Sequence, residues 1–337
     1  MTIKDIAKEC GVGLGTVSRV LNGQPGVSIT TREKVQAVID KYGFVLNQNA
    51  KMLKAQERKT LVILVKGSSS IFLNSLLECI QKKLESLPYT ADVVVLDEYD
   101  NEAQQACRIF YERKPVGMVF LGGNPDVYRE DFAKVQIPCV IISNQASSVG
   151  NSNLSSVSTD DNEAAGTIAS YLLKNGHKSI GIIGGDFETS EPTRRRYESF
   201  KKVLDENDIP FDFEKNYVST KYSFAGGAEA AKILLSRCPE ITAILTMADV
   251  MAVGAIRTLN DLGYSVPEDI SITGFDGLDL AEYCIPRLTT IRQKKELLVE
   301  QGFSILLECI EHNKPCRHIL LPFEFLEGES VRDLNDS

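Results

Sequence analysis

Several features are scarce or absent in this sequence, and each absence excludes a class of protein. The 337-residue chain has no Trp and only three histidines. It contains no run of about 18 apolar residues, the length that a membrane span needs. The first ten residues, MTIKDIAKEC, are charged and lack the apolar core of a signal peptide. We therefore expect a cytoplasmic protein with no membrane partner.

The usual motifs of metal sites and of nucleotide-dependent enzymes are also missing. The eight cysteines are scattered, with no Cys-x-x-Cys pair and no His at metal spacing, which predicts buried reduced thiols and no metal site. GIIGG at 181–185 follows an apolar run but lacks the G-x-G-x-x-G spacing, and no Gly-Lys-Ser/Thr motif occurs. None of the histidines ends a predicted sheet strand. We predict no catalytic residue, no cofactor and no enzymatic activity.

The charge is distributed unevenly along the chain. Residues 1–59 hold ten Lys/Arg and five Asp/Glu, a net +5, whereas the remainder holds 27 basic and 41 acidic residues, a net −14. A small basic region attached to a large acidic one is typical of a nucleic-acid reader joined to another domain. A solvated face rich in lysine is the alternative, which charge alone leaves open.

The first 22 residues have the pattern of two short helices joined by a glycine. Ile3, Ile6, Ala7 and Cys10 share one helical face, and Gly11 ends that helix. A second helix then directs Val17, Val20 and Leu21 inward. This arrangement predicts a helix-turn-helix, with an ordinary αα corner as the alternative. The polar residues left on its outer face are Thr16, Ser18, Arg19 and Asn22.

A third helix is expected to start at Thr30, because Thr30 and Glu33 have capping-box spacing. Gly43 is placed to end it. The segment 47–59 is polar and too short to form a stable helix alone, so we expect a linker there. The apolar stripe of the third helix consists of Val35, Val38, Ile39 and Tyr42.

From Leu61 onward, apolar runs alternate with helical patterns, which predicts βαβ units and doubly wound sheets. Two consecutive α/β sets of similar length indicate two lobes with a cleft between them. We expect the first lobe at about 60–159 and 289–318, and the second at about 160–288 and 319–331. The strands expected lie at 61–66, 91–97, 117–123, 138–143, 179–185, 216–219, 242–246, 270–275, 289–292 and 318–325, and the helices at 71–87, 101–113, 126–134, 162–175, 193–207, 224–236, 250–262 and 295–311.

Nearly the whole chain resembles the LacI/GalR family of lac-repressor-like regulators. The likeness rests on IKDIAKECGV, TVSRVLNG and TREKV near the N-terminus, and on GHKSIGIIGG, ADVMAVGAI, VPEDISITGFD and RLTTIRQ in the body. The resemblance implies a helix-turn-helix domain at 1–46, a hinge segment at 47–59, and a periplasmic-binding-protein-like effector body at 60–337. It also implies a homodimer on a pseudo-palindromic DNA operator.

The resemblance assigns roles to residues of the head and hinge. Leu14, Gly15 and Arg19 fall on the family's base-reading positions, while Thr16, Ser18 and Asn22 would hold phosphates or orient the helix. Leu53 would wedge between base pairs from the minor groove, with Lys54 beside it and Asn47 at the start of the hinge. The chain departs from better-known members at Gly13, Gly15 and Leu46, so its operator preference is not copied from a relative.

The resemblance also implies an effector site in the cleft. Arg196 and Asp276 are the polar residues expected to hold a ligand, and Asp249 is either a ligand contact or a helix N-cap. Phe72 would stack on a ligand ring or belong to the core. Asn144 is a further candidate, as are Phe187 and Phe224. Arg194 and Arg195 are expected to be solvated.

The function expected is that of a sequence-specific DNA-binding regulator, a repressor, controlled by a small effector for which a sugar is the family's usual choice. The alternative is a two-lobe solute-binding protein without a DNA role. The sequence leaves open the identity of the effector, whether it releases or tightens DNA binding, and whether dimers pair into tetramers.

Overall fold

The computed structural model describes residues 3–21, 25–42, 59–67, 70–97, 99–129 and 131–335. The chain divides into two compact units, Met1–Arg58 and Lys59–Ser337, here termed the head and the body. No helix in the described ranges is both long and apolar enough to cross a membrane. Within the same ranges, no group of three or more His, Cys, Asp or Glu is arranged to hold a metal ion.

The head consists of three helices around a small core, as predicted. Ile6, Cys10, Val17 and Val35 are fully buried at its centre. Gly11 adopts a φ of 60°, a conformation that glycine tolerates, and so allows the chain to turn between the first two helices. The helices are α1 (Ile3–Cys10), α2 (Leu14–Leu21) and α3 (Ile29–Tyr42).

The third helix differs from its prediction in its first residue and in the burial of Tyr42. It begins at Ile29 instead of Thr30, because the Ser28 hydroxyl accepts a hydrogen bond from the Thr31 amide at 3.3 Å and so caps the helix one residue earlier. Tyr42, expected inside, is 46% exposed, and its hydroxyl donates to Glu9 of α1. The predicted stop at Gly43 lies outside the described residues.

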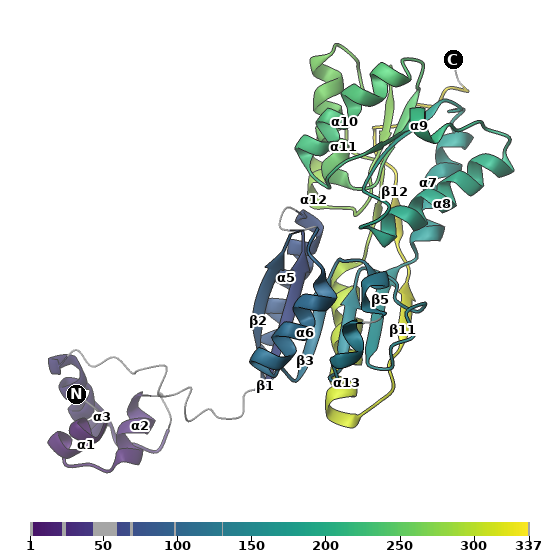
Figure 1. Cartoon of the computed structure of the whole chain (residues 1–337). Coiled ribbons are helices and arrows are strands. Elements are labelled where there is room, and N and C mark those ends of the chain that lie inside the picture. The colour runs from purple at the N-terminus through teal and green to yellow at the C-terminus, as the bar shows by residue number, and fades with distance from the viewer. Residues whose placement is uncertain are drawn as a thin grey trace. The chain divides into compact units, whose positions relative to one another are not determined.

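The body contains two lobes, each built on a parallel sheet with helices on both faces, which confirms the doubly wound prediction (Figure 1). In the first lobe six strands run in the order β11-β5-β4-β3-β1-β2, and every neighbouring pair is parallel. These strands are β1 (Lys59–Lys66), β2 (Tyr89–Leu96), β3 (Gly117–Leu121), β4 (Cys139–Ile142), β5 (Leu154–Thr159) and β11 (His318–Leu321).

Alternation along β1 shows why both faces of this sheet are covered. Leu61, Ile63 and Val65 belong to one buried cluster, and Val62 and Leu64 to another, since successive side chains of a strand point to opposite faces. The first cluster includes side chains of α5 (Ile71–Leu84) and α13 (Lys295–His312), and the second includes those of α6 (Glu102–Arg113) and of two 3₁₀ turns, η1 (Pro125–Tyr128) and η2 (Asp131–Lys134).

The second lobe has a four-stranded parallel sheet in the order β7-β6-β8-β9. Helices α7 and α8 cover one face, and α10 and α11 cover the other. The elements are α7 (Asp161–Lys174), β6 (Ile180–Gly184), α8 (Glu191–Glu206), α9 (Phe213–Asn216), β7 (Tyr217–Ser219), α10 (Phe224–Arg237), β8 (Ala243–Thr246), α11 (Asp249–Asp261), β9 (Ser271–Thr273) and α12 (Asp279–Tyr283).

One central strand of the first lobe, β5, has no counterpart among the predicted strands. Its sequence, LSSVST, is mostly polar, yet all six residues are buried. Hydrogen bonds compensate for the burial of two of its serines: Ser156 Oγ lies 2.8 Å from His318 Nδ1, and Ser155 Oγ accepts from the Arg317 amide at 3.2 Å. Because most residues of this buried strand are polar, the sequence shows no apolar run there.

The helix predicted at 126–134 is replaced by the two separate turns η1 and η2. Asn124 caps η1 by accepting from the Asp126 amide. The two turns place Tyr128 and Phe132 edge-on against Phe120 of β3, with ring centroids 5.1 and 5.8 Å away. Packing of these aromatic rings beneath the sheet therefore takes the place of a regular helix.

The tail crosses between the lobes at different points from those expected. β10 (Thr290–Arg292) pairs with β12 (Glu324–Leu326), and a bridge between Thr273 and Thr289 joins this pair to the second lobe. β11 pairs with β5 in the first lobe. The expected assignment of 289–292 to the first lobe and of 319–321 to the second is therefore wrong. The chain crosses after β10 and again after β11, so that β11 extends the six-stranded sheet while β10 and β12 form a separate pair beside the second lobe.

Candidate functional site

The outer face of α2 in the head is the candidate nucleic-acid surface. Val17 and Val20 are buried, so the helix is fixed to the head by one side. On the other side Gly15, Ser18 and Arg19 are exposed, Leu14 is 47% exposed, and Thr16 is half-buried. Within the described part of the head, Arg19 has no ion-pair partner. This face therefore exposes a guanidinium and short side chains, which is the kind of surface that fits a DNA groove.

Gly13, just before α2, and Gly15, within it, leave space around the helix. The Gly13 carbonyl accepts from the amides of Thr16 and Val17, which starts the helix without a capping side chain. A Cβ added at Gly13 or Gly15 would meet no described atom within 4 Å. The remaining predicted DNA contacts, Asn22, Asn47, Leu53 and Lys54, lie outside the described residues.

The body contains a cavity of about 440 Å³ between its two lobes. Its wall includes residues that follow the carboxyl ends of β1, β2, β3, β4, β6 and β7. This edge is where ligands bind in open α/β sheets, and the volume suits a small organic molecule. Of the predicted effector residues, the cavity brings together Phe72, Asn144, Arg196 and Asp276.

Arg196 is held rigidly in the cavity wall by α8. Its Nε donates to Asp161 Oδ1 at 2.7 Å, and its Nη1 donates to the Met247 carbonyl at 2.8 Å. The guanidinium carbon lies 3.5 Å from the ring centroid of Phe275. Arg196 and Asp161 are 6% and 1% exposed, so the ion pair is shielded from water. A fork of donors fixed in this way is preorganised for ligand hydroxyls.

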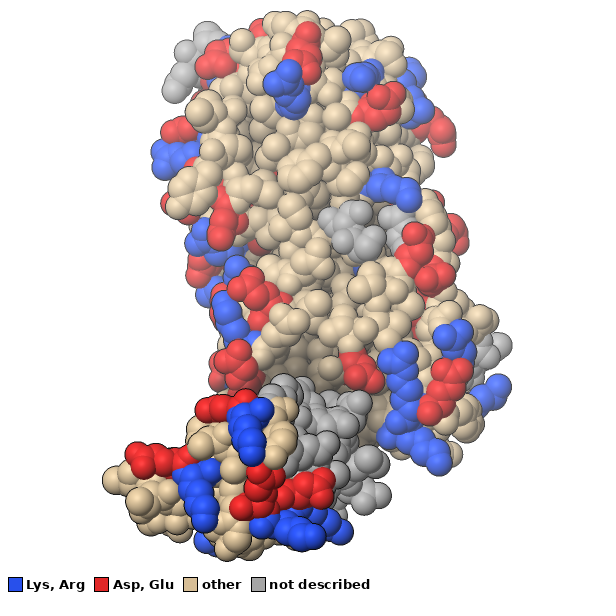
Figure 2. Space-filling model, turned by 90° about the vertical axis from the view of Figure 1, so that its left-hand side faces the viewer, with Lys and Arg blue, Asp and Glu red and all other residues tan. Residues whose placement is uncertain are grey.

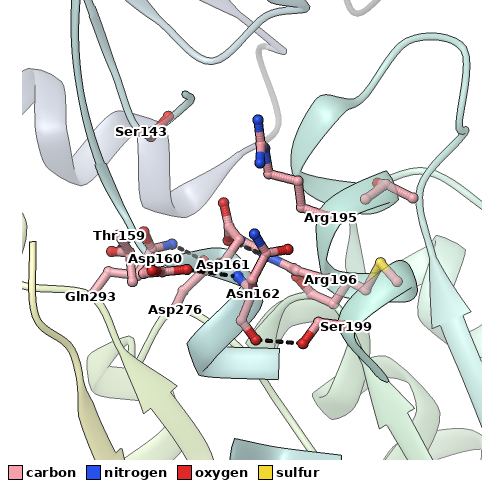
Figure 3. A network of polar contacts seen from close by, with 12 residues as sticks. Ser143, Thr159, Asp160, Asp161, Asn162, Arg195, Arg196, Ser199, Asp276 and Gln293 are labelled. Atoms are coloured by element: carbon pink, nitrogen blue, oxygen red, sulfur yellow. Dashed lines mark hydrogen bonds and ion pairs between the residues drawn. The ribbon is translucent and has the colours of Figure 1, made fainter. Parts of the chain in front are cut away.

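Asp276 lies beside Arg196 and is joined to a chain of hydrogen bonds (Figure 3). Gln293 donates to Asp276 Oδ1 at 2.8 Å and accepts from the Thr159 hydroxyl at 2.9 Å. Thr159 ends β5 and Gln293 follows β10, so this chain connects the cavity to two of the crossovers between lobes. Burial raises the pKa of Asp276 to about 7, although Arg196 and Gln293 oppose the shift.

Asp249 is neither of the two things predicted for it. It lies outside the cavity wall, and the N-cap position of α11 belongs to Ala248. The side chain is fully buried, where Oδ2 accepts from the Leu278 amide and Oδ1 from the Thr290 hydroxyl, at 2.7 and 2.6 Å. Burial and the neighbouring Asp276 raise its pKa well above the ordinary value. Asp249 therefore braces the loop that carries Asp276.

The first-lobe wall is shaped by the backbone at strand ends. Asn144 lines the cavity while its Nδ2 donates to the Gly123 carbonyl at 2.5 Å. Ser143 has a φ of 90°, and across the cavity Asp276 has a φ of 114°. Non-glycine residues in this region cost free energy, and such strain clusters at functional sites. Phe72 lines the cavity and also belongs to the buried core, so a contact with a ligand ring and a core position are compatible for this residue.

Several residues of the wall were not predicted from the sequence, and Phe187 and Phe224, like Asp249, lie elsewhere. Phe187 packs in an aromatic cluster with Tyr197 and Tyr217, and Phe224 is 44% exposed at the start of α10. The missed residues share a recognisable signal, because most of them follow the carboxyl end of a strand. They include Lys66, Asp97, Tyr99, Ser143, Tyr222 and Gln293.

The two lobes also touch at the mouth of the cavity. Arg194 Nη2 of α8 lies 2.6 Å from Asp126 Oδ2 of η1, and Asn124 Nδ2 donates to the Glu188 carbonyl at 2.9 Å. Arg194 was expected to be merely solvated, but it spans the cleft because α8 faces η1 there. Arg195 pairs with Glu191 on its own helix.

Comparison with known proteins relates both units to regulators. Residues 2–47 match the family described as "Bacterial regulatory proteins, lacI family", and residues 169–331 match "Periplasmic binding protein-like domain". The chain is 34% identical to the "HTH-type transcriptional regulator MalR" of Clostridium butyricum, over 98% of this chain and 99% of the relative. It is 31% identical to the "HTH-type transcriptional repressor PurR" of Vibrio vulnificus (strain CMCP6), over 99% of both.

A solved structure extends the likeness to the body. A LacI family transcriptional regulator from Enterococcus faecium with bound ribose superposes with a TM-score of 0.70. The two chains are 27% identical, and the match covers 82% of this chain and all of the other. The likeness to the two regulators compared by sequence spans nearly the whole chain, head and body alike.

Proposed function

Because this chain belongs to the lacI family of bacterial regulatory proteins and is a DNA-binding transcription regulator, we propose that it is a cytoplasmic repressor controlled by a sugar bound in its cleft. The observation that carries the proposal is the Arg196–Asp161 pair beside Asp276, a buried polar set facing a 440 Å³ cavity. The related regulator from Enterococcus faecium binds ribose in the same fold, which supports a sugar as the ligand class.

In this proposal α2 of the head enters the major groove of an operator half-site. Arg19 reads a guanine edge, Leu14 contacts a thymine methyl, and Gly15 leaves its position without a side-chain contact. Thr16, Ser18 and Asn22 hold phosphates or orient the helix. Asn47, Leu53 and Lys54 form the hinge that enters the minor groove.

In the body, Arg196, Asp276 and Asn144 would hydrogen-bond to sugar hydroxyls, and Phe72 would stack on the ring. A ligand shifts the regulator between forms only by the difference in its affinity for them. The polar chain from Asp276 through Gln293 to Thr159 offers a physical route, because it connects the cavity to the crossovers about which the lobes move.

A homodimer would bring two heads to the two halves of a pseudo-palindromic operator. Figure 2 shows a face of the body, carrying β2 and α10 to α12, whose middle is covered mostly by neutral side chains. Val93 and Val95 of β2 are 41% and 57% exposed, and Tyr283 and Ile285 at α12 are 81% and 89% exposed. Exposed apolar side chains on such a face support its use as the dimer interface.

The test measures operator binding by fluorescence anisotropy with and without a panel of sugars. Operator sequences recovered by selection from random DNA supply the probe. We expect nanomolar binding that weakens steeply as salt rises, and a change in affinity with at least one sugar. A protein that binds sugars but no selected DNA would instead fit the solute-binding alternative. Leu53→Ala should weaken operator binding and leave sugar binding unchanged.

A further inference from the structure

Two cations of the cavity wall, Lys66 and Arg196, are already neutralised by buried carboxylates. Lys66 Nζ lies 2.6 Å from Glu102 Oε2, and these side chains are 9% and 2% exposed. Arg196 is paired with Asp161 in the same manner. Buried ion pairs of this kind bind each charge to its partner and leave little net field for a third group. Neither cation is therefore available as an uncompensated anchor for an anion.

Glu102 is fixed so that this neutralisation persists. It begins α6, and its second oxygen, Oε1, accepts from the Asn124 amide at 2.5 Å. Gly123 adopts a φ of 109°, and a Cβ there would approach the Glu102 carboxylate to 2.5 Å. The loop after β3 is thus closed tightly over the carboxylate. Lys66 therefore faces a partner that the backbone holds in place.

Three further carboxylates line the same cavity. Asp97 Oδ1 accepts from the Tyr99 amide, Asp186 Oδ1 accepts from the amides of Glu188 and Thr189, and Asp276 Oδ1 accepts from Gln293. Within the described ranges none of the three forms an ion pair with Lys or Arg. Glu102 and Asp161 lie behind the wall and pair with two of its cations, so five carboxylates in all stand against three cations. The third cation is Lys221, whose Nζ lies 5.2 Å from the Tyr99 ring centroid.

We propose that this cleft selects neutral sugars and rejects phosphorylated or other anionic ones, with the buried Glu102–Lys66 pair as a determinant of that choice. A phosphate brings a charge of about −1.5 to −2 and needs strong, uncompensated donors. A neutral sugar needs only acceptors and donors for hydroxyls, which the carboxylates, Asn144 and Arg196 provide. The inference rests on the proposed sugar-binding function and specifies which sugars fit.

The experiment compares matched probes by isothermal titration calorimetry on the full chain: ribose, glucose, sucrose, trehalose and maltose, each beside its monophosphate. We expect at least one neutral sugar to bind, and its monophosphate to bind at least tenfold more weakly. A monophosphate that binds as tightly as its neutral parent would overturn the inference and leave the sugar-effector function standing. Binding of no probe in either set would instead count against the proposed function itself.

Glu102→Gln tests the assigned determinant. The glutamine keeps Oε1 as the acceptor for Asn124 but frees the charge of Lys66, so the preference for the neutral sugar should shrink at least threefold. Lys66→Gln combined with Glu102→Gln should restore it. Glu78→Gln is the matched control, because it removes the partner of Lys82 on the exposed face of α5 and should leave the preference for the neutral sugar unchanged. An unchanged preference in a folded Glu102→Gln protein would remove Glu102 from the proposal; if that variant does not fold, the wild-type comparison still decides.

Discussion

The candidate residues on the outer face of α2 in the head and those in the cleft of the body differ in how far they are exposed to solvent. On α2, Arg19 stands in solvent without an ion-pair partner in the described head, and Gly15 has open space beside it. In the cleft, Arg196 is buried, paired with Asp161 and stacked on Phe275. The head thus leaves the Arg19 guanidinium exposed, whereas the cleft holds the Arg196 guanidinium in one position.

The difference has a consequence for stability. An exposed side chain contributes little to folding, so its removal should affect binding alone. A buried charge supports its neighbours, so its removal should affect binding and folding together. Substitutions in the two regions can therefore separate effects on binding from effects on folding. The substitution expected to have the largest effect comes first.

Arg196→Ala should produce the largest effect. It leaves Asp161 buried without its cation, which typically costs about 3–5 kcal/mol of unfolding free energy. The sugar response of operator binding should disappear as well. Urea unfolding followed by circular dichroism measures the first effect, and operator anisotropy with sugar measures the second. Lys202→Ala, on the same helix and in an exposed pair with Glu206, should change the unfolding free energy by less than about 1 kcal/mol.

Asp276→Asn should show a pH-dependent effect of intermediate size. The folded pKa of Asp276 is raised to about 7 from an ordinary 3.8, so its destabilising contribution is absent at low pH, grows between pH 4 and 7, and is complete above 7. The variant lacks that contribution. Its unfolding free energy relative to wild type should rise by about 2–3 kcal/mol between pH 5 and 8. Urea unfolding at both pH values measures this difference, and a constant difference would contradict the assigned cause.

The contrast between head and cleft also explains how much the sequence could predict. The head helices follow from periodicity, and its reading residues follow from their place in a recognised motif. In the body, strands with apolar runs, such as β1 and β4, were predicted correctly. β5 was missed because its residues are mostly polar, and the partners of Ser155 and Ser156, Arg317 and His318, lie 162 positions away along the chain.

The cleft residues show the same limit more sharply. Arg196 and Asp276 were placed in the cavity wall by resemblance, but Asp249 was misread. Its partners, Leu278 and Thr290, lie 29 and 41 residues further along, so only the folded chain shows that it braces a loop. Gln293 follows a predicted strand but was missed because its partners in the site, Thr159 and Asp276, lie 134 and 17 residues away along the chain. Sequence patterns therefore do not reveal residues whose roles depend on partners far away along the chain.

Arg19→Ala should weaken operator binding without changing stability. A bidentate contact to guanine contributes about 1–3 kcal/mol of discrimination, so affinity should fall by roughly 5- to 150-fold. Melting of the body and its sugar affinity should stay as in wild type. Anisotropy with operators altered at single positions locates the base that Arg19 reads. Lys41→Ala, at the exposed end of α3, is the control for loss of a head charge.

The ion pair between Asp126 and Arg194 tests the cleft at its exposed edge, where it resembles the head more than the buried wall. The side chains are 41% and 33% exposed, so the pair should contribute only about 0.2–1 kcal/mol to lobe closure. Asp126→Asn and Arg194→Gln should each weaken sugar binding by no more than about fivefold, and the double variant should lose no more than either single one. Calorimetric titration of the three variants measures the coupling. Additive losses would show that the two residues act independently. A loss of sugar binding as large as that of Arg196→Ala would mean that sugar binding depends on this exposed pair as much as on the buried residues of the cleft.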